Sequence, residues 1–163
     1  MAIDACKSWV EGFVLKHNLC PFAHPFVQNG WIEYRLSTKK GLEERILEFL
    51  SVLDELDEKE IPKTLLLIYD DIELNFDSYL TLYELCEAAL EEEERGYQLA
   101  SFHPHYCFAD EEYDDPANLS NRSPYPMLHI LRLEDVANAI AGHKDPHGIP
   151  QRNISYLREK FSS

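Results

Sequence analysis

The sequence lacks the features that would divide the chain or carry it into a membrane. Its 163 residues contain only 6 glycines and no repeat, linker or low-complexity tract, so we expect one domain over residues 1–163. No apolar run is long enough to span a bilayer, and the first residues, MAIDACKSWVEGF, do not combine a basic start with an apolar segment. The sequence therefore predicts a cytoplasmic protein with no membrane partner.

Paired cysteines and the short signatures of common cofactor sites are also missing. The four cysteines, Cys6, Cys20, Cys86 and Cys107, are widely spaced and form no CxxC pair, which argues against a zinc knuckle or a thioredoxin-type redox pair. We expect reduced thiols in a reducing compartment. There is no phosphate loop, dinucleotide-binding fingerprint or Ser-His-Asp elbow, so the sequence indicates no particular cofactor, reaction or oligomeric state.

Basic residues are scarce. The chain has 15 Lys and Arg against 30 Asp and Glu, which gives a formal charge of -15. Such a field repels phosphate backbones and anionic lipids, so nucleic acid is not an expected partner. The acidic runs at residues 54–60 and 91–94 are typical of solvent-exposed helix faces. One non-catalytic alternative makes these faces a docking surface for a basic protein partner.

Four segments have the patterns of β-strands. Residues 31–36 alternate along the chain in the way that is typical of a half-buried strand. Residues 64–69, TLLLIY, are nearly continuously apolar, which indicates a parallel strand covered on both faces. Residues 97–103 and 127–133 are predicted as the third and fourth strands.

Helical spacing of apolar residues recurs between and around these strands. The predicted helices cover residues 4–18 with Asp4 as N-cap, 41–58, a segment from Asn75 or Asp77 to Gly96, the short stretch 134–141, and a last helix opened by Ile149 and Pro150.

The order of elements reads αβαβαββα and predicts a single α/β domain with a mixed four-stranded sheet. We expect the first three strands to run parallel and the fourth antiparallel, with helices over the sheet. Open α/β sheets bind ligands beyond the carboxyl ends of their parallel strands. Ser37, Asp70, Asp71 and His103 follow or end these strands, so the sequence places them around one crevice.

The stretch from Ser101 to Arg132 carries most of the chemically distinctive residues. Its connection, residues 104–126, is too long for a simple turn and is rich in aromatic residues, which favours an ordered, functional loop. His103 and His105 are spaced so that an extended backbone aims both rings to one side. With His129, they are the candidate ligands of a metal ion. His129 could equally be a general base or a core histidine.

Asn121, Arg122, Ser123 and Tyr125 form a second group of candidates in this stretch. They combine an amide, a guanidinium fork and hydroxyl groups on a backbone stiffened by prolines, a combination suited to holding an anionic or amide-bearing substrate. In the alternative interpretation, Arg122 only neutralises nearby acids such as Asp114 or Asp115.

Cys20 is the remaining candidate. It follows a predicted helix and precedes a proline, a position where a thiol can be partly exposed. A neighbouring cation would lower its pKa and make it a nucleophile. The alternative is a packing role, since buried cysteine is common in protein cores.

Three blocks of sequence are long and rich in unusual residue types: Leu19-Cys20-Pro21-Phe22-Ala23, Leu99 to Pro104, and Asn121 to His129. They resemble the signature of the domain of unknown function 1415 family, and the resemblance spans nearly the whole chain. The family's name carries no activity, so the resemblance implies a grouping in which Cys20, His103, Asn121, Arg122 and His129 belong to the pattern. The family commonly has an acidic residue in place of His105 and Gln in place of Cys107, which weakens a metal site that needs both His103 and His105.

The leading hypothesis is a small-molecule enzyme. In this hypothesis, Arg122 and Asn121 orient the substrate. Cys20 or His103, together with His129, performs nucleophilic or acid–base catalysis. One alternative is a protein that binds a divalent metal through His103, His129 and either His105 or Cys20. The other is the non-catalytic docking domain with an acidic face.

Overall fold

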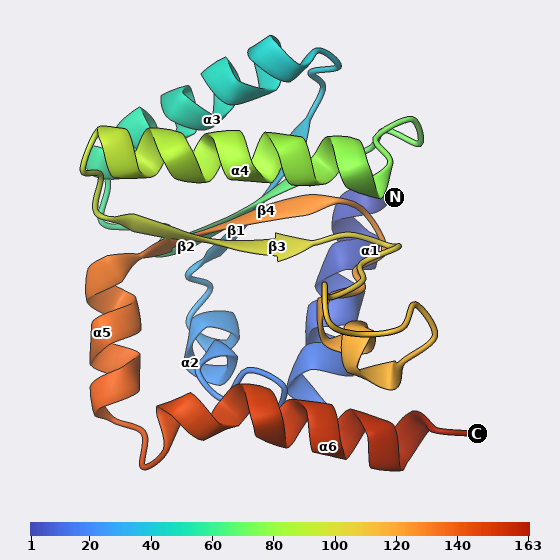
Figure 1. The fold of residues 1–163 in the computed structure, drawn as a ribbon. Helices are drawn as coiled ribbons and strands as arrows, with labels where there is room; N and C mark the ends of the chain where they lie inside the picture. The colour runs from blue at the N-terminus through green and yellow to red at the C-terminus, as the bar shows by residue number, and fades with distance from the viewer.

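A four-stranded sheet lies between two layers of helices in the computed structural model, which describes all of residues 1–163 (Figure 1). The strands are β1 (Ile32–Ser37), β2 (Thr64–Tyr69), β3 (Tyr97–Phe102) and β4 (Met127–Arg132), in the spatial order β1-β2-β4-β3. β1 pairs with β2 in parallel, and β4 runs antiparallel to both β2 and β3. The predicted mixed α/β fold is confirmed, with the first three strands sharing one direction and the fourth reversed.

The upper layer consists of α3 (Leu42–Asp57) and α4 (Phe76–Glu92). As predicted, Asn75 caps α4, since its side chain accepts a hydrogen bond from the Ser78 amide at 2.9 Å. The sequence predicts Gly96 at the end of this helix, but α4 already ends at Glu92. Glu94 supplies the left-handed residue (φ 49°) that reverses the chain there.

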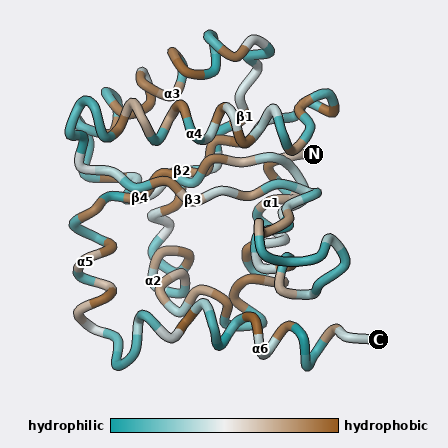
Figure 2. Tube along the Cα trace, viewed as in Figure 1, coloured by the Kyte–Doolittle hydropathy of each residue, from teal (hydrophilic) through white to brown (hydrophobic).

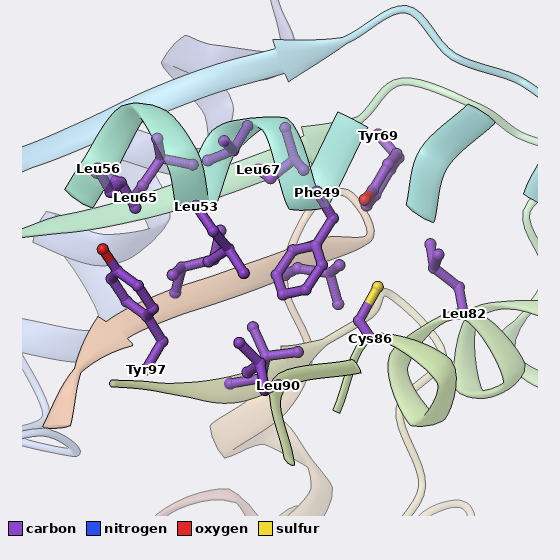
Figure 3. Packing of buried hydrophobic residues seen from close by; sticks show 14 of the residues in the cluster. Phe49, Leu53, Leu56, Leu65, Leu67, Tyr69, Leu82, Cys86, Leu90 and Tyr97 are labelled. Carbon is purple, nitrogen blue, oxygen red and sulfur yellow. The ribbon is translucent and has the colours of Figure 1, made fainter. Parts of the chain in front are cut away.

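The larger core lies between this upper layer and the sheet. It comprises 16 buried residues that include Phe49, Leu53, Leu67, Leu82 and Leu90, and Figure 3 shows side chains from both helices and from the sheet meeting there. Every residue of β2 is buried, in agreement with its predicted central position. The hydropathy of the chain follows this arrangement, with β2 among the most hydrophobic segments of the trace (Figure 2).

The lower layer consists of α1 (Ala2–Trp9), its π-helical continuation Val10–Leu15, α2 (Ala23–Gln28), α5 (Leu133–Ala141) and α6 (Ile149–Phe161). Its buried core is small, with 6 residues from α1, the π-helical turn, β2 and β4. Asp4 lies inside the first turn of α1 instead of capping it, because the helix begins at Ala2. The sequence does not predict α2, whose 6 residues are too few for a recognisable helical period. None of the helices is long and apolar enough to cross a membrane.

The long connection between β3 and β4 is ordered by a buried asparagine. It contains one short 3-10 helix, Pro116–Asn121; the other 3-10 helix of the chain, Pro146–Gly148, precedes α6. Asn118 is fully buried; its Oδ1 accepts from the Phe108 amide at 2.9 Å and its Nδ2 donates to the Glu112 carbonyl at 2.8 Å. The loop therefore has a fixed conformation of its own, as its aromatic content suggests.

Two buried tyrosines in the upper core are expected to respond in opposite ways to loss of their hydroxyl groups. The Tyr79 hydroxyl donates to the Met127 carbonyl at 2.6 Å and accepts from the Phe102 amide at 2.9 Å, whereas the Tyr69 hydroxyl is buried without a partner. Tyr79→Phe leaves two backbone groups unpaired and should lower the free energy of unfolding by about 2 kcal/mol. Tyr69→Phe should be neutral or stabilise by up to about 1 kcal/mol. Urea denaturation of both variants checks this, and equal losses would contradict it.

Candidate functional site

An open cleft lies where β1 and β2 end. It has a volume of about 830 Å³ and is lined by residues that include Lys40, Arg45, Asp70, Asp71 and Glu73. α3 begins just after β1 and α4 just after β2, so both helices start at this edge of the sheet (Figure 1). The cleft therefore occupies the position at which open α/β sheets commonly bind ligands.

The predicted crevice residues are divided between the cleft and its surroundings. Asp70 and Asp71 line the cleft, as the strand-end argument predicts. Ser37 is buried beside it and donates a hydrogen bond to Glu48. His103 does not line the cleft; its ring forms a hydrogen bond with the carbonyl of Leu74, which does. Only the two aspartates thus present side chains to a ligand.

Arg45 forms the floor of the cleft and is only 4% exposed. Its Nε donates to the Lys39 carbonyl at 3.0 Å, and its Nη2 donates to the Asp71 carboxylate. The guanidinium also lies over the Tyr69 ring, 5.2 Å from the ring centre. No hydrogen bond reaches Nη1, so a buried cation presents unused N–H donors to the cleft.

Asp71 is held in its ionised form by these neighbours. Burial raises the pKa of this carboxyl group, but the hydrogen bonds from Arg45 and the Glu73 amide, together with the charge of Lys40, lower it further than burial raises it. The net effect is a pKa below the ordinary value of an aspartate. The floor of the cleft is therefore a neutralised ion pair at neutral pH.

The rim of the cleft carries charges that have fewer partners. Lys40 is 66% exposed, and its Nζ lies 3.7 Å from Asp71 Oδ1 and 3.2 Å from the Asp70 carbonyl oxygen. The carboxylates of Asp70 and Glu73 are exposed and make no hydrogen bond or ion pair. Both signs of charge are thus available to a ligand at the rim.

His103 has a structural environment. It is 2% exposed and packs against the rings of Phe76 and Tyr79, with ring centres 5.3 and 5.2 Å away. Its Nδ1 accepts from the His105 amide at 3.0 Å, so its Nε2 carries the proton that is donated to the Leu74 carbonyl at 2.9 Å. Burial lowers the pKa of this imidazole. Both ring nitrogens are occupied, so His103 has no free atom for acid–base work.

His129 lies on the opposite face of the sheet. It shares the lower face with Met127, two residues away, because alternate residues of a strand point to the same side. Its Nε2 donates to the Thr64 hydroxyl at 2.7 Å, which in turn donates to the Ile130 carbonyl at 2.8 Å. Burial lowers the pKa of His129 to about 4, so its ring is neutral at pH 7. The structure does not bring His129 and His103 together.

The candidate substrate-holding residues bind their own loop. Arg122 donates from Nε to the Tyr106 carbonyl at 2.9 Å and lies over the Tyr113 ring, 4.4 Å from its centre. Asn121 donates to the Ser101 carbonyl at 2.8 Å, and Ser123 donates to the Tyr125 carbonyl at 2.6 Å. These three polar side chains close the connection between β3 and β4, and the Tyr125 side chain packs against the lower core.

Arg122 does not neutralise nearby acids either, because it forms no ion pair and donates only to backbone carbonyls. Asp115 instead pairs with Arg158 of α6, with 3.0 Å between Asp115 Oδ2 and Arg158 Nη2. Hydrogen bonds from Arg158 and from the Ala117 amide lower the pKa of Asp115. This pair joins the loop to the last helix, and Arg122 remains a partner of loop carbonyls.

The family profile described as "Protein of unknown function (DUF1415)" matches residues 1–163. The chain belongs to this family. No curated protein and no solved structure matches it. Two of the sequence blocks that resemble the family have clear structural roles in this DUF1415 member. Leu99 to Pro104 forms the end of β3, and Asn121 to His129 contains the start of β4 and the polar residues that shape the connection before it.

Cys20 of this DUF1415 chain lies between the π-helical turn and α2. The residue is partly exposed, and the Ala23 amide donates to its carbonyl oxygen at 3.1 Å. Burial raises the pKa of the Cys20 thiol more than the nearby Phe22 and Ala23 amides lower it. α6 holds the preceding segment, since Asn153 donates to the Leu19 carbonyl at 2.7 Å. No hydrogen bond joins Cys20 to His103, His129 or Arg122.

The candidate metal ligands do not converge. His105 extends away from the sheet, where its Nδ1 lies 2.8 Å from the Tyr113 hydroxyl, while His103 and His129 face opposite sides of the sheet. No group of three or more His, Cys, Asp or Glu side chains is arranged to hold a metal ion. The divalent metal stays a prediction without support from this geometry.

The basic residues of the cleft are not among the residues that the sequence singles out. Arg45 occupies a position of α3 that the helical period assigns to the buried face, between Leu42 and Phe49. A charged residue on an otherwise apolar helix face, shortly after a strand end, is the signal that could have identified it. Lys40 and Glu73 are exposed loop residues, and nothing in the sequence distinguishes them from other surface charges.

Proposed function

We propose that this DUF1415 chain binds a small charged metabolite in the cleft at the ends of β1 and β2. The carrying observation is Arg45, whose buried guanidinium lines the cleft and has an unused Nη1. Nη1 makes no hydrogen bond within the chain and is not sealed from solvent, so a ligand oxygen can accept a charge-assisted hydrogen bond from it.

The size and position of the cleft support the proposal. Small-molecule sites commonly enclose about 300–1,000 Å³, and the cleft measures about 830 Å³. The first turns of α3 and α4 both lie at this edge, where helix dipoles add partial positive charge. Arg45, Lys40 and these helix termini provide the donors for a carboxylate or a similar group.

Lys40→Met tests the site, with Lys39→Met as the matched control. Lys40 is exposed and lines the cleft, whereas the neighbouring Lys39 does not line it. We expect small carboxylates and amino acids, titrated into labelled protein, to shift the amide resonances of Asp71, Glu73 and Ser78. Binding should weaken about tenfold in Lys40→Met, the size of one charge-assisted hydrogen bond, and stay unchanged in Lys39→Met. A panel that shifts none of these amides would overturn the proposal.

The second candidate function is the thiol-dependent enzyme indicated by the sequence, with Cys20 as nucleophile and His129 as its base, although burial of the Cys20 thiol opposes it. It is favoured by the partial exposure of Cys20, by the Phe22 and Ala23 amides that lie near its thiol, and by the neutral His129 ring, whose Nδ1 has no hydrogen bond. In either case we propose a cytoplasmic location, where the four free thiols would stay reduced.

Alkylation of Cys20 by iodoacetamide tests the second candidate. Because burial raises the pKa of this thiol above the ordinary 9.0, we expect slow labelling at pH 7 and a midpoint above pH 9. A Cys6→Ala, Cys86→Ala and Cys107→Ala background isolates the signal. A midpoint near pH 7 would contradict this expectation and favour a nucleophilic Cys20.

A further inference from the structure

We infer that the ligand of the cleft is a small zwitterion with an apolar side chain, that is, a molecule of the apolar amino-acid class. This inference rests on the proposed function of the cleft and adds the chemical class of its ligand. It follows from three features of the lining: unused N–H donors, unpaired carboxylates and exposed apolar side chains.

The donors select a carboxylate. Arg45 is already neutralised by Asp71, so it offers the directed N–H groups of Nη1 and adds little net charge. Lys40 stands at the rim, 3.7 Å from Asp71 Oδ1, and is free to turn toward a ligand because its side chain is 66% exposed. A carboxylate bound between these two groups would accept charge-assisted hydrogen bonds from both.

The unpaired carboxylates of Asp70 and Glu73 select an ammonium group. Two cationic and three anionic side chains line the cleft, so a simple anion would meet an excess of negative charge. The charge of the whole chain, -15, opposes a simple anion as well. A simple cation would leave the Arg45 donors unused. A ligand that carries both groups matches both sets of side chains.

The apolar walls indicate what else the ligand carries. Leu42 is 44% exposed and Ile72 fully exposed, and the buried Leu74 and Leu82 complete the apolar lining. Exposed aliphatic side chains at a cleft gain free energy when an apolar group covers them. An aliphatic ligand side chain would do so while its charged end lies against Arg45 and Asp70.

Three matched compounds separate the parts of this inference: L-leucine, 4-methylpentanoate, which lacks the amine, and isopentylamine, which lacks the carboxylate. Titration calorimetry should show leucine binding at least about tenfold more tightly than either of the others, since each charged group contributes a hydrogen-bonded contact. The same titrations, followed by the amide resonances of Asp71 and Glu73, locate the binding in the cleft.

Variants assign each charged group to its partner. Asp70→Asn should weaken leucine about tenfold and leave 4-methylpentanoate unchanged or tighter, because only leucine has the ammonium group. Lys40→Met should weaken leucine and 4-methylpentanoate and spare isopentylamine. Asp77→Asn is the matched control, because Asp77 is an exposed aspartate of α4 that does not line the cleft.

The outcomes distinguish the inference from the function on which it rests. If 4-methylpentanoate binds in the cleft as tightly as leucine, the zwitterion is wrong and the cleft is a carboxylate site. Leucine binding that is insensitive to Asp70→Asn overturns the assignment of the ammonium group. If none of the three compounds shifts the cleft amides, the inference fails, and the wider panel described above decides whether the proposed function fails with it.

Discussion

Asp71→Ala is expected to lower the free energy of unfolding by about 3 kcal/mol, because it leaves the Arg45 guanidinium buried without its counter-charge. The side chains of the pair are only 5% and 12% exposed, so water cannot replace the lost carboxylate without rearrangement. Chemical denaturation at pH 7 measures the loss. Lys40 does not compensate, since it carries the same sign of charge as Arg45.

The double variant Arg45→Met with Asp71→Leu is the control for this prediction. Removing both charges avoids the uncompensated ion, so the double variant should lose clearly less stability than Asp71→Ala alone. Additive losses, or an Asp71→Ala variant as stable as the native chain, would show that the pair is solvated and would weaken the argument that Arg45 has donors to offer a ligand.

Stability is expected to fall by about 3 kcal/mol as the pH is lowered from 6.5 to 4, owing to His129. Burial lowers the pKa of the folded imidazole to about 4 from an ordinary 6.5, so the unfolded state binds the proton first. The stabilisation from neutral His129 is complete above pH 6.5 and is lost progressively down to pH 4. His103, whose pKa is also lowered, acts in the same direction.

His129→Gln separates His129 from the other titrating groups. Glutamine keeps a donor for the Thr64 hydroxyl but does not titrate, so the variant should show a much flatter profile between pH 6.5 and 4. Asp71 also contributes to the pH dependence of stability, but its lowered pKa confines that contribution to more acidic solution. The His129→Gln substitution should leave the contribution of Asp71 unchanged. A variant profile as steep as that of the native chain would mean that folding does not lower the pKa of His129.

The ends of the predicted strands indicate the position of the cleft but not its basic residues. Asp70 and Asp71 could be placed there because they directly follow β2, whose continuous apolar run identifies it as the central parallel strand. Arg45 comes from the helix that follows β1, and its approach to Asp71 depends on how α3 packs on the sheet. That packing angle is not encoded in any local pattern.

The loop residues show the reverse situation. Their types, an amide, a guanidinium and a hydroxyl, indicate strong hydrogen-bonding capacity. The structure directs this capacity to the backbone carbonyls of Ser101 in β3 and of Tyr106 and Tyr125 in the loop. A backbone carbonyl and a ligand oxygen are equivalent acceptors for Arg122. Residue type alone cannot distinguish between them, because the choice is made by which acceptor the folded chain brings within reach.

By itself, the sequence determined the four strands, their directions, most of the helices and an ordered connection before β4. The elements follow from local periodicity and turn residues, and the strand directions follow from the order of the elements along the chain. Only the tertiary structure decided that His103 and His129 lie on opposite faces of the sheet and that Cys20 bonds to neither. It also decided that Arg45 is the buried cation of the cleft. These contacts join residues far apart in the chain, and their geometry follows from how the helices pack against the sheet.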